Sequence, residues 1–451
     1  MTGTAIVSRA RIPGPPGIPL LGNLVEYARD PLGRQVRWIA DYGDVVRYRL
    51  GGQDIVLIAD PELVREVLAL GSDRMVKGRA LQAAKRVVGE GLLTSEGDAH
   101  LRARRMLAPL FQPQQLRRYG EVMVRSTEEQ MRGWRAGEVR DVADEMMALA
   151  LRVIARVLFH REVDEEVDRI GAALDDSLSV VARLTIPLYE RLERLPLPSH
   201  LRFRRARRYL DALVYGLIDE RRRSGERPDD LLSRLLEAQD EEGDGGRLDD
   251  RQIRDEVMTL FLAGHETTAN GMAWTFQLLA ETPAAAEKLH AELAETLGDR
   301  VPGYEDLARL PYLRAVVFES LRLRPPVWNV ARRCVEPFDA GGRVLPPGTV
   351  VIVSPWVSHR QARWFDDPET FRPDRWLDAD PRRTHRGKYF PFGGGRRVCI
   401  GEHFALMEMQ LLLATVAGRF AFERADHRPI RLQPTITIRP RGGLRMRLSA
   451  A

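Results

Sequence analysis

A ten-residue segment near the C-terminus constrains this chain more than any other feature: Phe392-Gly393-Gly394-Gly395-Arg396-Arg397-Val398-Cys399-Ile400-Gly401. Its three consecutive glycines let the backbone turn tightly and approach a flat ligand closely. Cys399 stands just before a strongly apolar stretch, residues 402–417, that we expect to be helical. The start of a helix carries partial positive charge and unpaired N–H groups, which favour a thiolate over a thiol. Gly401 leaves room for such N–H groups, so Cys399 is predicted to be an anionic metal ligand rather than a buried small side chain.

The complete Phe-x-x-Gly-x-Arg-x-Cys-x-Gly spacing resembles the signature of the cytochrome P450 family, and the resemblance extends from Pro15 to the end of the chain. It implies a haem-thiolate protein in which Cys399 ligates the iron of haem b. It also implies that Phe392 and Gly401, as parts of this signature, lie against the haem. Thiolate ligation pushes electron density onto the iron and favours cleavage of the O–O bond.

The stretch Ile253–Glu281 is predicted to form one long helix that crosses the middle of the fold. Its centre reads Ala263-Gly264-His265-Glu266-Thr267-Thr268, and threonine hydroxyls can open a helix locally. In the family, an acid followed by threonine marks enzymes that activate O₂ with two electrons and two protons. The resemblance therefore assigns Glu266 to proton supply through water and Thr267 to hydrogen bonding of the oxygen. It places Ala263 beside the haem, while we interpret His265 as a packing residue.

Haem carries two propionate groups, which need charge-assisted donors. His100 and Arg104 are four residues apart on a predicted helix, so both can reach one propionate. Many family members have tryptophan where this chain has His100. The resemblance adds Arg397 and Arg332 to the donors, although the adjacent Arg333 leaves the register of Arg332 open.

The segment Phe318-Glu319-Ser320-Leu321-Arg322 places an acid and an arginine on one face of a largely apolar helix. The resemblance adds Arg375 as the third member of a buried Glu-Arg-Arg triad. We expect these three residues to maintain the fold and the shape of the haem pocket and to take no part in the chemistry. Removing one partner would leave a buried charge uncompensated.

The fold class predicted is mainly α (α+β), as one cytochrome P450 domain over residues 1–451, with a helical body, a small β-rich region and the long central helix. Pro13–Pro19 predicts an extended lead-in, and β-rich runs on either side of Gly51-Gly52 predict a hairpin. Helical spacing dominates from Pro61 to about Glu295. Strands are predicted after Pro325, at Thr349–Val353, Thr435–Ile438 and Leu444–Leu448, before and after the helix at 402–417.

Composition limits the alternatives. The 451 residues carry a net charge of +5, which does not imply nucleic-acid binding, and the two cysteines fit a reducing cytoplasm. Met1–Pro13 has no apolar stretch long enough for a signal peptide or a membrane anchor. We therefore expect a soluble, cytoplasmic monomer that binds neither nucleic acid nor a membrane.

The resemblance and the Glu266-Thr267 pair favour a monooxygenase that inserts one atom of O₂ into its substrate. Two alternatives remain open. One is a peroxygenase or hydroperoxide isomerase that needs no external electrons, and the other is a non-catalytic haem protein that senses or binds a ligand. For a monooxygenase we expect electrons from a separate ferredoxin or flavodoxin with its NAD(P)H-dependent reductase, because no reductase is fused to the chain.

Family analogy also suggests where substrate and redox partner bind. An apolar substrate such as a fatty acid, terpenoid or steroid is expected, because the regions that line the pocket in the family are rich in Val, Leu, Ile and Ala here. These regions are Met75–Leu93, Ser177–Leu197, Leu260–Thr267, Val327–Ala331 and Thr435–Ile438. Arg102, Arg105, Arg117 and Arg118 are predicted to form a basic surface on which an acidic ferredoxin or flavodoxin docks.

Overall fold

The computed structural model describes residues 12–71, 73–160, 167–184, 197–226, 228–240, 242–243 and 245–451. Their contacts divide the chain into two compact units. Unit 1 comprises Met1–Gln82, Val327–Thr370 and Asp380–Cys399, and unit 2 comprises Ala83–Pro326, Phe371–Ala379 and Ile400–Ala451. The mainly α fold class is confirmed, while the single domain over residues 1–451 stays a prediction.

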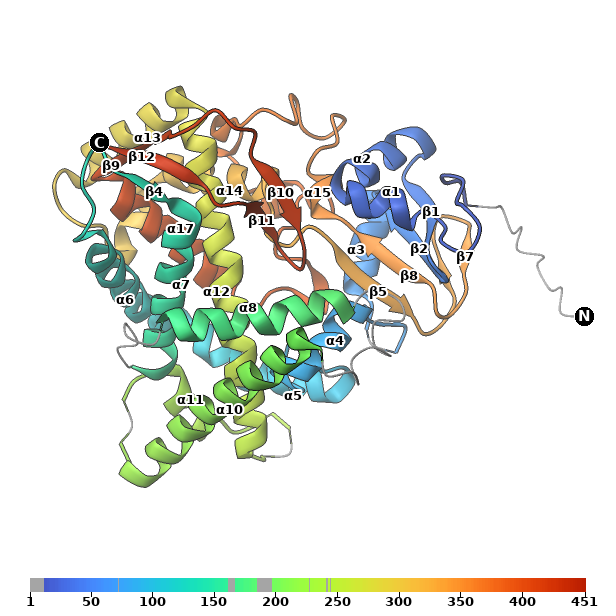
Figure 1. Cartoon of the computed structure of the whole chain (residues 1–451), viewed down its shortest axis with the longest axis horizontal. Coiled ribbons are helices and arrows are strands. Elements are labelled where there is room, and N and C mark those ends of the chain that lie inside the picture. The colour runs from blue at the N-terminus through green and yellow to red at the C-terminus, as the bar shows by residue number, and fades with distance from the viewer. Residues whose placement is uncertain are drawn as a thin grey trace, which may run out of the picture. The chain divides into compact units, whose positions relative to one another are not determined.

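A five-stranded sheet in the order β1-β2-β8-β5-β3 forms the basis of unit 1. Its strands are β1 (Val45–Leu50), β2 (Gln53–Ile58), β3 (Met75–Lys77), β5 (Val330–Cys334) and β8 (Val350–Val353). The predicted hairpin is confirmed as the antiparallel pair β1 and β2, and β2 pairs in parallel with β8. Figure 1 shows the orange β5 and β8 beside the blue β1 and β2, so segments far apart in sequence share this sheet.

The interior strands β2 and β8 end in nearly continuous apolar runs, as strands covered on both faces do. Val56 and Val351 pack with Val64 and Leu68 of α3 (Pro61–Ala69) in the core of this unit. Cys334 of β5 belongs to the same core. The other elements of unit 1 are α1 (Leu24–Arg29), α2 (Pro31–Tyr42), β6 (Phe338–Asp339), β7 (Val344–Leu345), α15 (Pro355–Ser358), α16 (Pro381–Thr384) and η4 (Gly395–Arg397), and α4 (Arg79–Val88) begins here.

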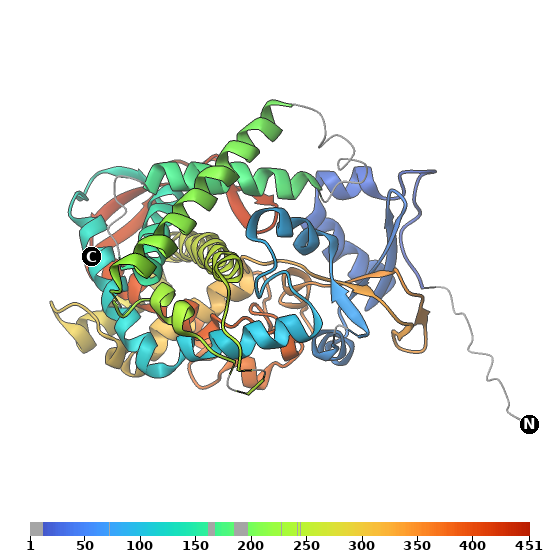
Figure 2. The same ribbon diagram turned by 90° about the horizontal axis from the view of Figure 1, so that it is seen from below.

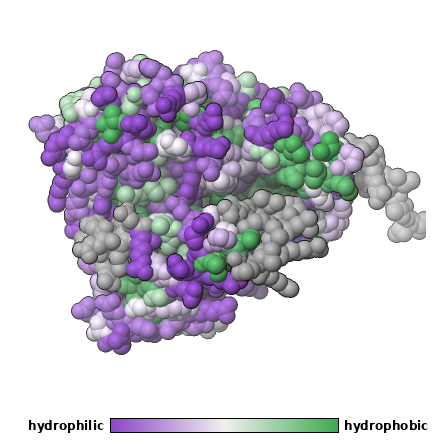
Figure 3. Space-filling view, viewed as in Figure 1, coloured by the Kyte–Doolittle hydropathy of each residue, from purple (hydrophilic) through white to green (hydrophobic). Residues whose placement is uncertain are grey.

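The proline-rich lead-in is extended, as predicted, and the Arg47 N–H donates to the carbonyl of Pro13 at 2.9 Å. Most of the surface drawn in Figure 3 is hydrophilic, with a group of hydrophobic residues over the α1 region of unit 1. Large apolar side chains exposed in this region are Ile18, Leu20, Leu21 and Val25.

Unit 2 is built around α12 (Asp250–Ala280), which confirms the long helix predicted from the sequence. The helix begins with a capping box between Asp249 and Gln252. Figure 2 looks nearly along its axis. The other helices of unit 2 are α5 (Gly97–Leu107), η1 (Ala108–Phe111), α6 (Pro113–Met131), α7 (Val142–Phe159), α8 (Val167–Leu184), α10 (Pro198–Ser224), α11 (Leu231–Glu237), α13 (Pro283–Leu297), η2 (Tyr304–Arg309), α14 (Pro311–Leu323), η3 (Pro373–Trp376) and α17 (Glu402–Ala417).

Two small sheets complete unit 2. β4 (Val139–Asp141), β12 (Arg445–Ala450) and β9 (Phe420–Arg424) form one, and the hairpin of β10 (Arg431–Pro434) and β11 (Ile438–Arg441) forms the other. The strand predicted at Thr435–Ile438 is wrong for its first three residues, which form the turn of this hairpin. Pairing of Pro434 with Ile438 fixes the register and overrides the strand preference of the threonines.

Across the described residues, no helix combines the length and the apolar character that a membrane span requires. Much of the Ser177–Leu197 region that was predicted to line the substrate pocket lies outside the described residues, because residues 185–196 are not described.

Candidate active site

The cysteine loop lies in unit 1 and closes on itself through backbone hydrogen bonds. The Cys399 N–H donates to the carbonyl of Phe392 at 3.0 Å, and the Gly393 N–H donates to that of Phe390 at 2.9 Å. Cys399 is exposed, whereas Cys334 is fully buried, and burial raises the pKa of the Cys334 thiol. Of the two cysteines, therefore, only Cys399 has a sulfur that an external ligand can reach.

One glycine of the loop is required by the protein's own packing. Gly395 has a φ of +64°, and a Cβ at this position would lie 2.3 Å from the carbonyl oxygen of Leu68 in α3. The sequence predicted that the glycines allow the backbone to approach a flat ligand. At Gly395 the close neighbour is instead the end of a helix, so this glycine fixes the loop against the body of unit 1.

Unit 1 also carries the predicted donors Arg332 and Arg397. Arg332 is 5% exposed on β5, where it pairs with Lys77 of β3, while Arg333 is exposed on the opposite face of the strand. Arg397 ends η4 and is half-buried, as is Phe392. The alternation along β5 therefore favours Arg332 over Arg333 as a donor to a buried group.

Unit 2 carries the other predicted donors, on α5. His100 is buried at 6% exposure, and Arg104, one turn further along, is half-buried. The structure thus separates the expected haem contacts into a set on unit 1 and a set on unit 2. Gly401, the residue before α17, belongs to the second set.

The four arginines that were predicted to form a basic docking surface all pair with acids, three carboxylates in total, so the positive charge of this surface is smaller than the sequence suggested. Arg105 makes a bidentate pair with Asp240, at 2.9 and 2.8 Å, and Arg102 lies 3.7 Å from the same carboxylate. Asp240 is buried, and a buried carboxylate requires compensating charge. Arg117 pairs with Glu305 and Arg118 with Asp229, so each of the four arginines faces an acid.

The middle of α12 exposes one narrow face. From Ile253 to Leu279, the residues that are not buried are Ala263, Gly264 and Thr267. The Thr267 hydroxyl donates to the carbonyl of Ala263 at 2.6 Å, and the helix continues without a break through this segment. The local opening that we expected from the threonines is therefore absent here, although the face with Ala263 and Thr267 is accessible.

Glu266 points into a polar network that the sequence did not reveal. Its Oε1 accepts hydrogen bonds from the Thr437 hydroxyl and from Arg439 Nε, the latter at 2.7 Å. Arg439 Nη1 in turn contacts Asp175 Oδ1 of α8 at 2.9 Å. A sequence signal for the contact exists in Glu266, Asn270 and Trp274, three hydrogen-bonding side chains that follow one another at intervals of four residues and therefore share one face of the helix.

His265 is 2% exposed, which agrees with its interpretation as a packing residue. Burial lowers the pKa of His265 to about 4, against the opposing effect of the Glu266 carboxylate. The ring is consequently neutral at physiological pH and adds no charge beside Glu266.

The predicted triad is confirmed: Glu319 and Arg322 are fully buried, and the side chain of Arg375 is 9% exposed. Glu319 accepts from both Nε and Nη2 of Arg322 at 2.9 Å, and from Arg375 Nε at 3.0 Å. The Arg372 N–H and the Trp376 indole N–H donate to the same carboxylate at 2.9 and 2.8 Å. Five donors therefore surround its two oxygens, which leaves no proton-transfer role and supports a structural one.

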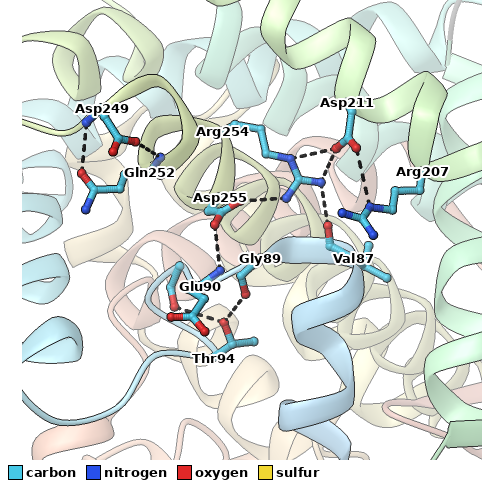
Figure 4. A network of polar contacts seen from close by, with 11 residues as sticks. Val87, Gly89, Glu90, Thr94, Arg207, Asp211, Asp249, Gln252, Arg254 and Asp255 are labelled. Carbon is cyan, nitrogen blue, oxygen red and sulfur yellow. Dashed lines mark hydrogen bonds and ion pairs between the residues drawn. The ribbon is translucent and has the colours of Figure 1, made fainter. Parts of the chain in front are cut away.

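A second arginine network fixes the beginning of α12 (Figure 4). Arg254 donates to Asp211 of α10 at 2.8 Å, to Asp255 at 2.9 Å and to the carbonyl of Val87 at 2.8 Å. Asp255 also accepts from the Glu90 N–H at 2.8 Å. This network joins the first turns of α12 to α10 and to the loop after α4, so the helix that carries Glu266 is held near its N-terminal end.

The cytochrome P450 family model matches residues 12–444. Cyclooctatin synthase from Streptomyces melanosporofaciens is 40% identical over 96% of this chain and 94% of its own length. Cyclooctat-9-en-7-ol 5-monooxygenase from the same organism is 38% identical over 90% of this chain and 88% of its own length. Pentalenene oxygenase from Streptomyces avermitilis is 36% identical over 97% of this chain and 96% of its own length.

The chain belongs to the cytochrome P450 family, whose cofactor is a haem iron with a thiolate ligand. It is an oxidoreductase of the P450 monooxygenase type, as its monooxygenase relatives are. The two alternative functions left open by the sequence are therefore set aside.

Proposed function

We propose that this enzyme inserts one oxygen atom from O₂ into an apolar terpenoid, either a hydrocarbon or a partly hydroxylated product. The observation that carries the proposal is the full-length similarity to enzymes named for pentalenene and cyclooctat-9-en-7-ol. Both names describe largely hydrocarbon molecules, in keeping with the apolar composition of the regions expected to line the pocket. Fatty acids and steroids are the less favoured substrate classes.

Haem b is the proposed cofactor, and the chain offers donors suited to it. The exposed Cys399 supplies the thiolate, and the propionate donors are His100, Arg104, Arg332 and Arg397. Phe392, Gly401 and Ala263 are proposed to lie against the ring. Arginine suits a propionate because its planar guanidinium binds a carboxylate with two parallel hydrogen bonds.

When bound, haem supplies the iron at which O₂ is activated. The residues of the chain then control proton movement. Thr267 presents its hydroxyl on the accessible face of α12, where it orients water by hydrogen bonding. Glu266 takes up a proton and releases it to water, and its Oε2, which accepts no hydrogen bond from the described residues, is available for this exchange.

Electrons are proposed to come from a ferredoxin or flavodoxin with its NAD(P)H-dependent reductase. The cluster Arg102, Arg105, Arg117 and Arg118 stays a predicted docking surface, although three acids, Asp240, Glu305 and Asp229, offset part of its charge. A cytoplasmic location, a monomeric state and the absence of nucleic-acid and membrane partners stay predictions.

The test of ligation compares the two cysteines. The reduced carbon monoxide complex should show the red-shifted Soret band of a thiolate ligand, and Cys399→Ala should lose this band while Cys334→Ala retains it. Persistence of the band without Cys399 would refute the assignment.

The test of substrate class is a spectral titration of the ferric enzyme. Cyclic terpene hydrocarbons and their mono-alcohols should displace iron-bound water at lower concentrations than fatty acids or steroids of similar size. Equal or tighter binding of a fatty acid or a steroid would overturn the terpenoid assignment.

A further inference from the structure

One face of α12 is attached to the beginning of β11 by three side chains. Glu266, Asn270 and Trp274 lie one turn apart, so they project from the same side of the helix. Asn270 Nδ2 donates to the Thr437 hydroxyl at 3.1 Å, and the Trp274 indole donates to the Ile438 carbonyl at 2.9 Å. With the bonds to Glu266, these contacts fix the position of residues 437–439 relative to the helix.

Arg439 lies between two carboxylates of different exposure. Its side chain is 25% exposed, while that of Glu266 is 5% exposed and that of Asp175 is 59% exposed. Burial alone would lower the pKa of Arg439, but the charges of Glu266 and Asp175 outweigh this effect and raise it. The guanidinium thus remains a cation that a buried acid and a solvent-exposed acid share.

We propose that Arg439 is a positioning residue that holds Glu266 as a carboxylate, and that Asp175 regulates this hold by sharing the same guanidinium. This inference rests on the proposed role of Glu266 and deepens it. The step itself is a proton exchange: Glu266 takes one proton from solvent water and passes one proton on, with no change in electrons. The charge of Arg439 stabilises the ionised form of Glu266 and so disfavours its uptake of a proton. Asp175 weakens this effect, because it offsets part of the charge of Arg439.

The other ionisable groups near Glu266 affect its protonation less than Arg439 and Asp175 do. His265 is neutral above a pH of about 4 because burial lowers its pKa. Asp144 of α7 is close enough to Asp175 for their charges to interact, and the pKa of Asp144 is raised by burial and by the charges of Asp141, Glu145 and Asp175. At neutral pH the electrostatic potential at Glu266 is therefore set by the cation of Arg439 and by the acids near that cation, above all Asp175.

The test is an infrared pH titration of the haem-loaded enzyme that follows the protonated carboxyl band of Glu266. The band is assigned by its loss in Glu266→Gln. In Arg439→Gln it should appear at a pH about 1 unit or more above that of the unmodified enzyme, because an opposite charge in contact is removed. In Asp175→Asn it should appear at a lower pH, since Arg439 then acts on Glu266 alone. Arg439→Lys keeps the cation and should restore most of the original position.

Asp176→Asn is the matched control, because it removes the same charge from the neighbouring residue of α8. Asp176 pairs with Arg202 at 3.4 Å and has no contact with Arg439. The alkaline limb of the pH–rate profile should move up in Arg439→Gln, down in Asp175→Asn and not at all in Asp176→Asn. Shifts of equal size and sign in Asp175→Asn and Asp176→Asn, or none in any variant, would overturn the proposal.

Should Arg439→Gln fail to accumulate, the comparison of Asp175→Asn, where a downward shift is expected, with Asp176→Asn, where none is expected, decides the question alone, since both acids are on the surface. Normal turnover in Glu266→Gln would refute the proton-supply role of Glu266. The infrared titration would still report whether Arg439 and Asp175 control its protonation, so the two failures are distinguishable.

Discussion

Two buried glutamates of unit 2, Glu319 and Glu266, each bind arginine, yet their surroundings differ in kind. Glu319 is 0% exposed and receives five hydrogen bonds on its two oxygens. Glu266 is 4% exposed and receives two, both on Oε1, and its arginine leads to an acid at the surface. A saturated carboxylate can only maintain structure, whereas a half-satisfied one with a route to solvent can exchange a proton.

Replacing Glu319 should produce the largest effect. In Glu319→Ala the cations of Arg322 and Arg375 lose their partner inside the protein, which we expect to cost about 3–5 kcal/mol of unfolding free energy. That is a large share of a typical stability of about 5–15 kcal/mol. Denaturant unfolding and the yield of haem-loaded protein measure the effect. A normal yield with unchanged stability would show that the triad is dispensable.

Replacing Glu266 should have the opposite profile to replacing Glu319: the catalytic rate should fall, and the free energy of unfolding should stay nearly unchanged. In Glu266→Gln the shape is retained but no proton can be released, so kcat should fall by about 100-fold or more, as for a lost general acid. Thr267→Ala should bind substrate normally and divert electrons to hydrogen peroxide. The turnover rate measures the first variant, and the product formed per NAD(P)H consumed measures the second. Unchanged coupling in the threonine variant would contradict the relay.

A third buried glutamate, Glu408 of α17, extends the comparison to a carboxyl group without arginine and without well-formed hydrogen bonds in the described part of the chain. It is 1% exposed, neither carboxyl oxygen has a hydrogen-bond partner of good geometry in the described structure, and burial raises its pKa to about 8. The folded protein therefore retains a proton that the unfolded chain has released. Stability should fall by about 1.4 kcal/mol for each pH unit as pH rises toward 8.

Glu408→Gln should remove this pH dependence and raise the unfolding temperature at pH 8. Measurements between pH 6.5 and 8 avoid the contribution of His265, whose lowered pKa costs stability only as pH falls below about 6.5. An unchanged slope of unfolding free energy against pH in this interval would show that Glu408 is ionised in the folded protein.

The smallest effect is expected for an exposed pair of the same chemistry. Arg117 and Glu305 lie 2.8 Å apart with side chains that are 61% and 69% exposed. Glu305→Ala should change the unfolding free energy by less than about 1 kcal/mol, since exposed ion pairs contribute little. The variant is also the control for Glu319→Ala, and a cost comparable to that of Glu319→Ala would remove the distinction between buried and exposed pairs.

Local patterns predicted much of this molecule. The cysteine loop, the Glu319–Arg322 pair, the first hairpin and the long helix each depend on residues close together in sequence or on a motif with fixed spacing, whereas Arg375, 56 residues from Glu319, was added only by the family resemblance. The contacts of Glu266 could not be predicted, because Thr437 and Arg439 are 171 and 173 residues away. The acids that pair with the arginine cluster were missed for the same reason: Asp240, which pairs with Arg105, lies 135 residues further along.

The contact between α7 and α12 has a consequence for how homologous chains can vary. A Cβ on Gly264 would lie 2.9 Å from Cδ1 of Ile154, closer than real side chains approach. Cδ1 is the end of a flexible side chain, so alanine at the position of Gly264 requires the residue at the position of Ile154 to adopt another rotamer or to be smaller, or the two helices to move apart.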